Sequence, residues 1–202
     1  TQLDWYVGQV FKQLKQLGLD RNTIVIFTSD NGPHREGGAN PDYFKSYGPL
    51  RGVKRDLYEG GIRVPMLAWA PGKIKTGSQT HQVSAFWDMM PTLAELTGTT
   101  LPTKGDGISL LPTLFSETGQ QQHEYLYWEF HEMGGRQAIR SGNWKLIRQP
   151  VVGQTELELY DLSKDIHEDN NVAKQYPDKV GELIKLMDQA NTPSSIFPFS
   201  AQ

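Results

Sequence analysis

The hydrophobic pattern at the start of the chain predicts a helix followed by a buried strand. Apolar side chains recur every three or four residues, as on one face of a helix, at Leu3, Val7, Val10, Leu14 and Leu17. Thr1 can cap the start of this helix, and Gly18 fits the position just past its end. Residues 23–27 are apolar and mostly β-branched, which is typical of a buried strand. A helix that leads directly into such a strand is typical of an α/β sheet with helices on its faces.

The middle of the chain predicts a long loop, a second strand and a helix. Residues 33–52 are rich in Gly, Pro and Asn, and a loop of this length inside a domain is usually functional or disordered. Residues 62–70 predict a strand, and Pro65 places that strand at an edge or a bulge. Residues 84–96 predict a helix that tolerates Pro91 in an early turn.

The second half of the chain changes to closely spaced strands. Four short apolar runs are separated by turn residues, at 123–130, 137–140, 144–148 and 157–162. Strands without intervening helices predict an antiparallel meander. Pro177 then opens a final helix with an apolar face. We therefore predict an α/β fold that ends in a small antiparallel-sheet-plus-helix subdomain.

Composition and charge exclude several functional classes. The net charge is −3, so bulk charge gives no reason to expect nucleic acid or an anionic membrane as partner. No apolar run approaches the length of a membrane-spanning helix. The absence of cysteine excludes disulfides, thiolate metal sites and a cysteine nucleophile within these residues. The chain starts at Thr1 without a signal segment, so we expect a processed or recombinant product.

Residues with metal-ligand chemistry follow the first strand directly. Asp30 and Asn31 are hard oxygen donors of the kind that Ca²⁺ and Mg²⁺ prefer, and α/β proteins bind ligands at the carboxyl ends of their strands. An Asx turn that caps a core strand explains the same pair equally well. Because Ca²⁺ takes about six to eight ligands, substrate, water or protein outside this stretch would have to supply the others.

A histidine and a basic cluster come next along the chain. His34 is isolated in the loop, and Arg51, Lys54 and Arg55 lie within five residues of one another. A divalent metal beside fixed cations suits a tetrahedral oxyanion, because the metal polarises an ester oxygen and a lysine stabilises charge on the departing group. The ordinary alternatives are a hydrogen-bonding histidine and solvated ion pairs, in which Glu59 pairs with the arginine four positions before or after it.

Other polar residues are weaker candidates for a site. Glu129 and His131 share one strand face and could line a site, although a solvent-facing edge explains them equally well. We expect His81 and Asp88 to be structural, and His167 to lie with its acidic neighbours in a solvated loop.

Two stretches carry a specific family signal. They are Thr-Ser-Asp-Asn-Gly-Pro-His at 28–34 and Gly-Pro-Leu-Arg-Gly-Val-Lys-Arg-Asp-Leu-Tyr-Glu-Gly-Gly-Ile-Arg-Val-Pro at 48–65. Weaker but concordant stretches lie at 87–93, 142–146 and 158–162. Together they resemble the C-terminal portion of a type I, formylglycine-dependent sulfatase of the alkaline phosphatase-like superfamily, and the resemblance covers almost the whole chain. Asp-Asn-Gly alone would be weak evidence, but it becomes specific when Lys-x-x-x-Tyr-Glu-Gly-Gly follows at this distance.

The resemblance implies roles for five residues. Asp30 and Asn31 match the second pair of calcium ligands, and Lys54 matches the catalytic lysine that bridges sulfate and leaving-group oxygens. His34 and Arg51 lie where family members shape the substrate pocket. In the family, a hydrated formylglycine attacks sulfur, a histidine protonates the leaving alcohol, and sulfate is then eliminated from the hemiacetal.

The resemblance also implies parts that this chain lacks. The formylglycine is formed from Cys-x-Pro-x-Arg, or from a serine version, and residues 46–51 miss the serine version by one position of spacing. The nucleophile, the first pair of calcium ligands and the catalytic histidine are expected upstream of Thr1. We therefore expect residues 1–116 to be the last part of the large α/β domain and residues 117–202 to be the small C-terminal subdomain. The missing N-terminal portion would be their partner, and its absence should leave an apolar edge exposed and the calcium site empty or weak.

We predict a segment of a periplasmic or secreted sulfuric ester hydrolase that acts on a sulfated carbohydrate or an aryl sulfate. Without its nucleophile, the isolated segment should be inactive. Candidates for contacts with sugar rings are Tyr43, Phe44, Tyr47, Trp128 and His131. One alternative is a phosphoester or phosphonate hydrolase of the same superfamily, which would usually bind two transition-type metals through several Asp and His ligands. The other is a non-catalytic binding or structural fragment.

Overall fold

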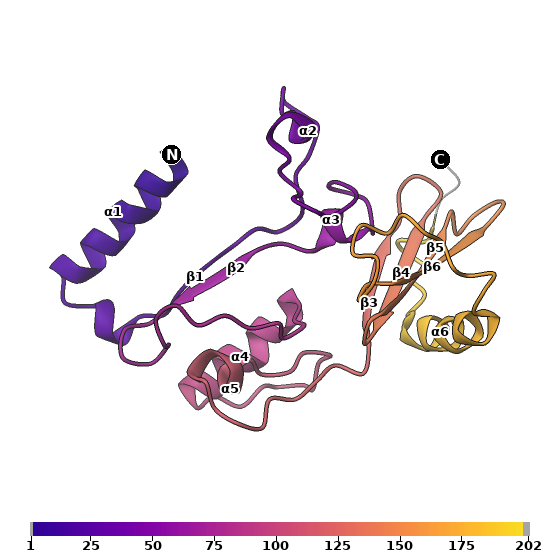
Figure 1. Cartoon of the computed structure of the whole chain (residues 1–202). Coiled ribbons are helices and arrows are strands. Elements are labelled where there is room, and N and C mark those ends of the chain that lie inside the picture. Colours follow the sequence, from indigo (N-terminus) through magenta and orange to yellow (C-terminus); the bar gives the residue numbers. More distant parts are fainter. Residues whose placement is uncertain (1, 200–202) are drawn as a thin grey trace. The chain divides into compact units, whose positions relative to one another are not determined.

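The chain forms two compact units, which the ribbon in Figure 1 follows from the N-terminus to the C-terminus. The first unit comprises the residues up to Thr28 together with Pro65–His123, and the second comprises Ser29–Val64 together with the residues from Glu124 onward. This computed structural model describes residues 2–199, so the predicted cap at Thr1 lies outside the described residues.

The first unit contains the predicted N-terminal helix and the first two strands. Helix α1 spans Gln2–Gln16, a 3-10 turn follows at Asp20–Asn22, and β1 spans Val25–Thr28. Strand β2 (Met66–Trp69) pairs antiparallel with β1 in a two-stranded sheet. The predicted helix at 84–96 is a 3-10 turn at Phe86–Asp88 that continues as α4 (Met89–Thr97), and a short helix, α5 (Leu111–Phe115), follows.

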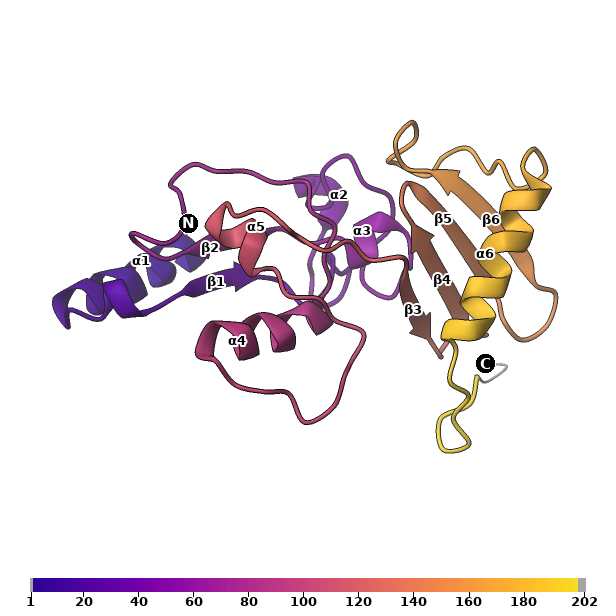
Figure 2. The same ribbon diagram turned by 90° about the horizontal axis from the view of Figure 1, so that it is seen from below.

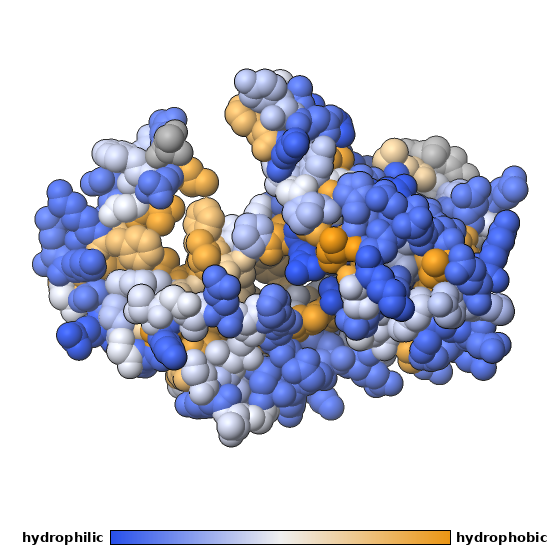
Figure 3. All heavy atoms as spheres, in the orientation of Figure 1, coloured by the Kyte–Doolittle hydropathy of each residue, from blue (hydrophilic) through white to orange (hydrophobic). Residues whose placement is uncertain are grey.

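Helix α1 is amphipathic as predicted, but its apolar side is largely exposed. Leu3, Tyr6 and Val10 are each more than half exposed, and Figure 3 shows apolar side chains along this helix. Phe11 is an exception, because its ring meets the ring of Trp69 at a centroid distance of 4.8 Å. Within residues 2–199, no residue of α1 is buried.

Asp88 organises the polar interior of the first unit. Its fully buried carboxylate accepts hydrogen bonds from the backbone N–H groups of Ala85 at 2.7 Å and Ile108 at 2.9 Å. The Nε2 atom of His123 lies 2.9 and 3.0 Å from the two carboxylate oxygens. The structural role expected for Asp88 is therefore confirmed, through partners that the sequence did not indicate.

The second unit contains the predicted antiparallel meander. Its strands are β3 (Leu126–Phe130), β4 (Arg136–Ser141), β5 (Trp144–Gln149) and β6 (Glu156–Asp161), and they pair in the order β3-β4-β5-β6. The final helix, α6 (Pro177–Ala190), lies across one face of this sheet, as Figure 2 shows. Two short helices, α2 (Pro41–Phe44) and α3 (Glu59–Ile62), belong to the segment between Ser29 and Val64.

Strand alternation gives this sheet two buried faces. On one face, Ile139, Leu146 and Leu159 pack against Leu183 and Met187 of α6. On the other face, the buried cluster consists of Leu57, Ala138, Ile147, Tyr160 and Leu162. The segment that precedes α3 therefore packs on the face opposite α6. None of the helices within residues 2–199 combines the length and hydrophobicity that crossing a bilayer requires.

Candidate active site

The two stretches that carry the family signal lie against each other through their backbones. The N–H of Gly32 donates to the carbonyl oxygen of Gly61 at 2.9 Å, and the N–H of Lys54 donates to the carbonyl oxygen of Pro33 at 2.8 Å. The first bond starts directly after Asn31, and the second starts at the lysine itself. The structure therefore brings the stretch that contains Asp30 and Asn31 against the stretch that contains Lys54.

Three glycines make this close approach possible. A Cβ atom on Gly32 would lie 1.8 Å from the carbonyl oxygen of Gly60. A Cβ on Gly61 would lie 2.1 Å from the carbonyl oxygen of Asp56, and one on Gly60 would lie 2.4 Å from that of Arg51. Because real Cβ atoms essentially never come within 3.0 Å of such atoms, each position requires glycine. The double glycine thus allows the backbone to pack closely at this point.

Asp30 and Asn31 present side-chain oxygens that no residue of the described chain uses. Asp30 is exposed, and within residues 2–199 its carboxylate makes no hydrogen bond or ion pair. The Nδ2 of Asn31 donates to the carbonyl oxygen of Gly32 at 2.8 Å, which leaves its Oδ1 as an acceptor. An Asx turn requires one of these oxygens to accept a backbone N–H, and neither does so in the described part of the chain.

These oxygens fit a hard cation, and they would fill part of its coordination sphere. A carboxylate and an amide carbonyl are the donors that Ca²⁺ and Mg²⁺ prefer. Among the residues that the structure describes, no group of three or more His, Asp or Glu side chains could hold a metal ion. Asp30 and Asn31 offer two side-chain oxygens for such an ion, and the half calcium site remains a prediction.

Lys54 differs from its charged neighbours because its ammonium group is unpaired. Arg55 forms an ion pair with Glu36, and the carboxylate of Asp56 lies 2.9 Å from Nη1 of Arg136. Lys54 is half-buried, and its Nζ has no hydrogen-bond or ion-pair partner within residues 2–199. The alternative of ordinary ion pairs therefore explains Arg55 but does not explain Lys54.

His34 and Arg51 occupy different environments. His34 is exposed, and its Nδ1 accepts the backbone N–H of Glu36 at 3.1 Å, so a neutral ring carries its proton on Nε2. The guanidinium of Arg51 lies 4.0 Å from the centroid of the Tyr58 ring and donates to the carbonyl oxygen of Glu168. The side chain of Arg51 thus links its own loop to the loop of Glu168, while His34 is exposed.

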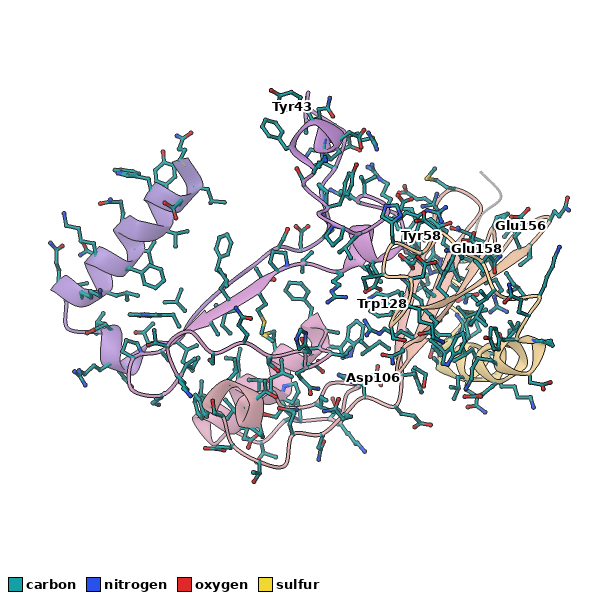
Figure 4. All side chains as sticks on the ribbon, viewed as in Figure 1. Tyr43, Tyr58, Asp106, Trp128, Glu156 and Glu158 are labelled. Carbon is teal, nitrogen blue, oxygen red and sulfur yellow. The ribbon has the colours of Figure 1, made fainter. Side chains whose placement is uncertain are left out.

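The candidates for sugar contacts fall into two groups. Tyr43 and Phe44 are largely exposed on α2, where Figure 4 labels Tyr43, and their rings meet edge to face at 4.8 Å. Tyr47 donates to the carboxylate of Asp42 at 2.9 Å. By contrast, Trp128 is half-buried on β3.

His131 belongs to a cavity beside the four-stranded sheet. Its ring stacks on those of Phe197 and Phe199, at centroid distances of 4.6 and 4.2 Å. Its Nε2 lies 2.8 Å from a carboxylate oxygen of Glu129, and both residues line a cavity of about 680 Å³. Glu129 and His131 therefore line a cavity, which was the first of the two interpretations of this pair.

A buried ion cluster, consisting of Glu59, Lys145 and Glu168, was not predicted. Lys145 on β5 is 0% exposed, and its Nζ lies 3.0 Å from Oε1 of Glu59 and 2.9 Å from Oε1 of Glu168. The backbone N–H of Glu59 donates to Oε2 of Glu168 at 2.6 Å. The signal that could have revealed the cluster is a lysine in the middle of an apolar strand, between Trp144 and Leu146.

This cluster decides two expectations. Of the two ion pairs considered for Glu59, the pair with Arg63 is present at 3.6 Å, whereas Arg55 pairs with Glu36, and Glu59 is buried rather than solvated. The loop around His167 is not solvated throughout, because Glu168 is fully buried. His167 itself is exposed and lies 2.8 Å from a carboxylate oxygen of Asp169. A charged residue in a polar loop can be buried where it pairs with a buried residue of opposite charge, and the sequence does not identify that partner.

Burial acts differently on the two carboxylates of the cluster. Burial alone would raise the pKa of Glu59, but the charge and hydrogen bond of Lys145, with help from Arg140, hold it below its ordinary value. Burial raises the pKa of Glu168 above its ordinary value, and Lys145 offsets only part of that rise. The cluster therefore holds Glu59 ionised and makes the charge of Glu168 costly.

A second polar group, around Glu158, lies on the same face of the sheet. The hydroxyl of Tyr58 donates to a carboxylate oxygen of Glu158 at 2.8 Å, and Figure 4 shows these two side chains close together. The hydroxyl of Tyr160 and the amide of Gln149 bind the same carboxylate. Burial, followed by the bond to Glu158, raises the pKa of Tyr58 to about 12. The loop that carries Lys54 is thus tied to the sheet at Tyr58 as well as at Glu59.

Proteins similar to this chain are sulfatases. The family model described as Sulfatase matches residues 1–99, and the model described as N-sulphoglucosamine sulphohydrolase, C-terminal, matches residues 53–192. N-acetylgalactosamine-6-O-sulfatase of Bacteroides thetaiotaomicron is 36% identical over 95% of this chain and 40% of its own length. Human arylsulfatase A is 33% identical over 93% of this chain and 41% of its own length. Rat steryl-sulfatase is 42% identical over 62% of this chain and 22% of its own length.

Solved structures agree with these relatives. A sulfatase from the glycosaminoglycan metabolism of Bacteroides thetaiotaomicron superposes with a TM-score of 0.75 at 34% identity, covering 93% of this chain and 42% of that one. A protein solved in complex with its substrate D-glucosamine-2-N,6-O-disulfate superposes with a TM-score of 0.73 at 28% identity, covering 92% of this chain and 37% of that one. The chain thus spans about 40% of the length of the relatives that match most of it.

Proposed function

Because this chain belongs to the sulfatase family, we propose that it is the C-terminal part of a sulfuric ester hydrolase. Its fold is the C-terminal portion of the alkaline phosphatase-like sulfatase fold. In this proposal the chain supplies half of a calcium site and a lysine that contacts sulfate, and the nucleophile belongs to the remaining part of the enzyme. The observation that carries the proposal is that Asp30, Asn31 and Lys54 keep unpaired ligand groups on two stretches whose backbones are bonded together.

Each unpaired group has a role in the proposed reaction. The carboxylate of Asp30 and Oδ1 of Asn31 would hold a calcium ion, which supplies positive charge that polarises the sulfate oxygens. The ammonium of Lys54 would stabilise negative charge that develops on the leaving oxygen. Because no carboxylate within residues 2–199 forms an ion pair with Lys54, its ammonium group can bind an anionic substrate directly.

We propose a sulfated carbohydrate as the substrate. Two similar proteins support this choice, since one is named for the 6-O-sulfate of N-acetylgalactosamine and the other was solved with a disulfated glucosamine. His34 would donate from Nε2 to a sugar oxygen, because its Nδ1 already accepts a backbone N–H. Arg51 would act on the substrate pocket through its loop, since its guanidinium is engaged with Tyr58 and Glu168.

The alternative of a phosphoester hydrolase is less well supported. Both family models that match this chain, and the relatives that match most of it, are sulfatases. The alternative of a non-catalytic fragment predicts that no upstream segment carries a nucleophile. Both are outcomes of the experiment below.

The test is a comparison of matched esters with the full-length protein that contains these residues. We expect release of sulfate from sulfated N-acetylgalactosamine or glucosamine, at a rate well above phosphate release from the matched phosphate ester. The isolated 202 residues should release none. Preference for the phosphate ester, or an upstream segment without Cys/Ser-x-Pro-x-Arg, would overturn the proposal.

A substitution then tests the role of the unpaired lysine. In the full-length protein, Lys54→Met should lower kcat by about 10²–10³-fold, as the loss of a group that stabilises developing charge does. Its melting temperature should stay unchanged, because the ammonium has no partner in the described chain. Lys185→Met, at an exposed position on α6, is the matched control and should retain activity. Equal activity of the two variants would remove Lys54 from the mechanism.

A further inference from the structure

The buried ion cluster connects the candidate active site to the four-stranded sheet. Lys145 comes from β5, Glu59 opens α3, and Glu168 comes from the loop that follows β6. All three side chains are at most 2% exposed. A buried ion pair is weak evidence for stability, because desolvation of the charges offsets their attraction. The position of the cluster in the chain is therefore more informative than its energy.

Glu59 is the point at which the cluster meets the active-site backbone. Its own N–H donates to Glu168, while its side chain binds Lys145. The N–H of the next residue, Gly60, donates to the carbonyl oxygen of Arg51 at 2.6 Å. The carbonyl oxygen of Gly61 then accepts the N–H of Gly32. Three consecutive residues thus link the cluster to both stretches of the site.

The loop of Glu168 contacts the site in a second way. Its backbone carbonyl accepts a hydrogen bond from Arg51, three positions before Lys54. Glu168 has a φ of 60°, a left-handed conformation that costs a non-glycine residue free energy and persists only where its surroundings enforce it. The contacts of Glu168 with Lys145, Glu59 and Arg51 are the surroundings that hold it there.

We propose that Lys145 is a positioning residue for the proposed sulfatase reaction. Its ammonium holds Glu59 and Glu168 together, so that α3 keeps the Asp30–Asn31 turn in register with the loop of Lys54. This inference rests on the proposed function, because it assigns Lys145 to the same site.

Removal of the lysine charge should move the site while the sheet stays folded. Without the ammonium group of Lys145, the carboxylates of Glu59 and Glu168 would lose the cation that both contact and would repel each other. Arg140 and Arg63 lie 3.5 and 3.6 Å from Oε2 of Glu59, so they would neutralise Glu59 but leave Glu168 uncompensated. The cores on the two faces of the sheet contain no member of the cluster and remain in place.

The experiment compares Lys145→Met with Lys179→Met in the full-length protein. The control variant also loses an ion pair, between Lys179 and Glu182 on α6 at 2.6 Å. Hydrogen exchange is measured by mass spectrometry on peptides from residues 30–34, 51–62 and 180–190, and kcat is measured on a sulfate ester. We expect Lys145→Met to raise exchange about tenfold in the first two peptides only and to lower kcat about 100-fold, since misplacement by about 1 Å can have that effect. Lys179→Met should change neither the exchange in residues 30–34 and 51–62 nor kcat.

Two results would overturn the positioning role. One is wild-type exchange in residues 30–34 and 51–62, and the other is a rise of equal size in the α6 peptide, which a merely structural role predicts. If Lys145→Met does not fold, Glu168→Gln is measured in the same way, with the same two results deciding. The exchange measurement does not depend on catalysis. A wild-type protein without sulfatase activity would therefore refute the proposed function, while hydrogen exchange would still decide whether Lys145 positions the two stretches.

Discussion

Replacement of Gly32 by alanine tests the backbone junction on which the candidate site depends. The added Cβ would lie 1.8 Å from the carbonyl oxygen of Gly60, whereas ordinary van der Waals contact begins at 3.4 Å. The two stretches must therefore separate by about 1.6 Å, which is the difference between these distances. The hydrogen bond from Gly32 to Gly61, at 2.9 Å, cannot survive that separation.

The expected cost has two parts. Overpacking a close contact costs about 1–3 kcal/mol, and loss of a backbone hydrogen bond costs about 0.5–1.5 kcal/mol. We therefore expect Gly32→Ala to lower the free energy of unfolding by about 2–4 kcal/mol, measured by urea denaturation of the full-length protein. If the loop yields locally instead, stability falls less, but the displaced Asp30 and Asn31 should lower kcat by about 100-fold.

Gly181→Ala is the matched control for this prediction. Gly181 lies in α6 with open space where a Cβ would be, so alanine should stabilise the helix by about 0.5–1 kcal/mol. If Gly32→Ala retains both the wild-type unfolding free energy and the wild-type kcat, the junction tolerates a Cβ and the requirement for glycine at this position is refuted.

Three further predictions concern buried polar groups. His123→Leu removes the side-chain partner of the buried carboxylate of Asp88, so we expect a loss of about 1–3 kcal/mol in thermal unfolding, with the exposed His81→Leu as an unaffected control. Burial would raise the pKa of Glu59, but the lysine of the buried ion cluster lowers it overall, so its stabilising contribution is present above its ordinary pKa and is lost as the pH falls. The difference in urea midpoint between wild type and Glu59→Gln should therefore shrink between about pH 7 and pH 4, and a constant difference would contradict the assignment. Burial and a hydrogen bond raise the pKa of Tyr58 to about 12, so the absorbance difference between wild type and Tyr58→Phe should show no tyrosinate below about pH 11.

The sequence alone predicted the elements whose causes are local. Apolar spacing in α1 and α6 and the turn residues between β3 and β6 act over a few positions, and the helices and the antiparallel meander follow them. The sequence also indicates Asp30, Asn31 and Lys54 as candidate ligands, because an unusual combination of residue types stands at a strand end and in a glycine-rich loop, and this stays a prediction.

Only the tertiary structure decided which charged side chains form ion pairs within the chain. Arg55 and Lys54 are adjacent and chemically similar, yet Arg55 pairs with Glu36, 19 positions away, while Lys54 pairs with no described residue. Lys145 meets Glu59 across 86 positions, and Glu59 meets Glu168 across 109. The sequence pattern carries no information on such separations, because ion pairs depend on distance in space and on burial, which are properties of the packed chain.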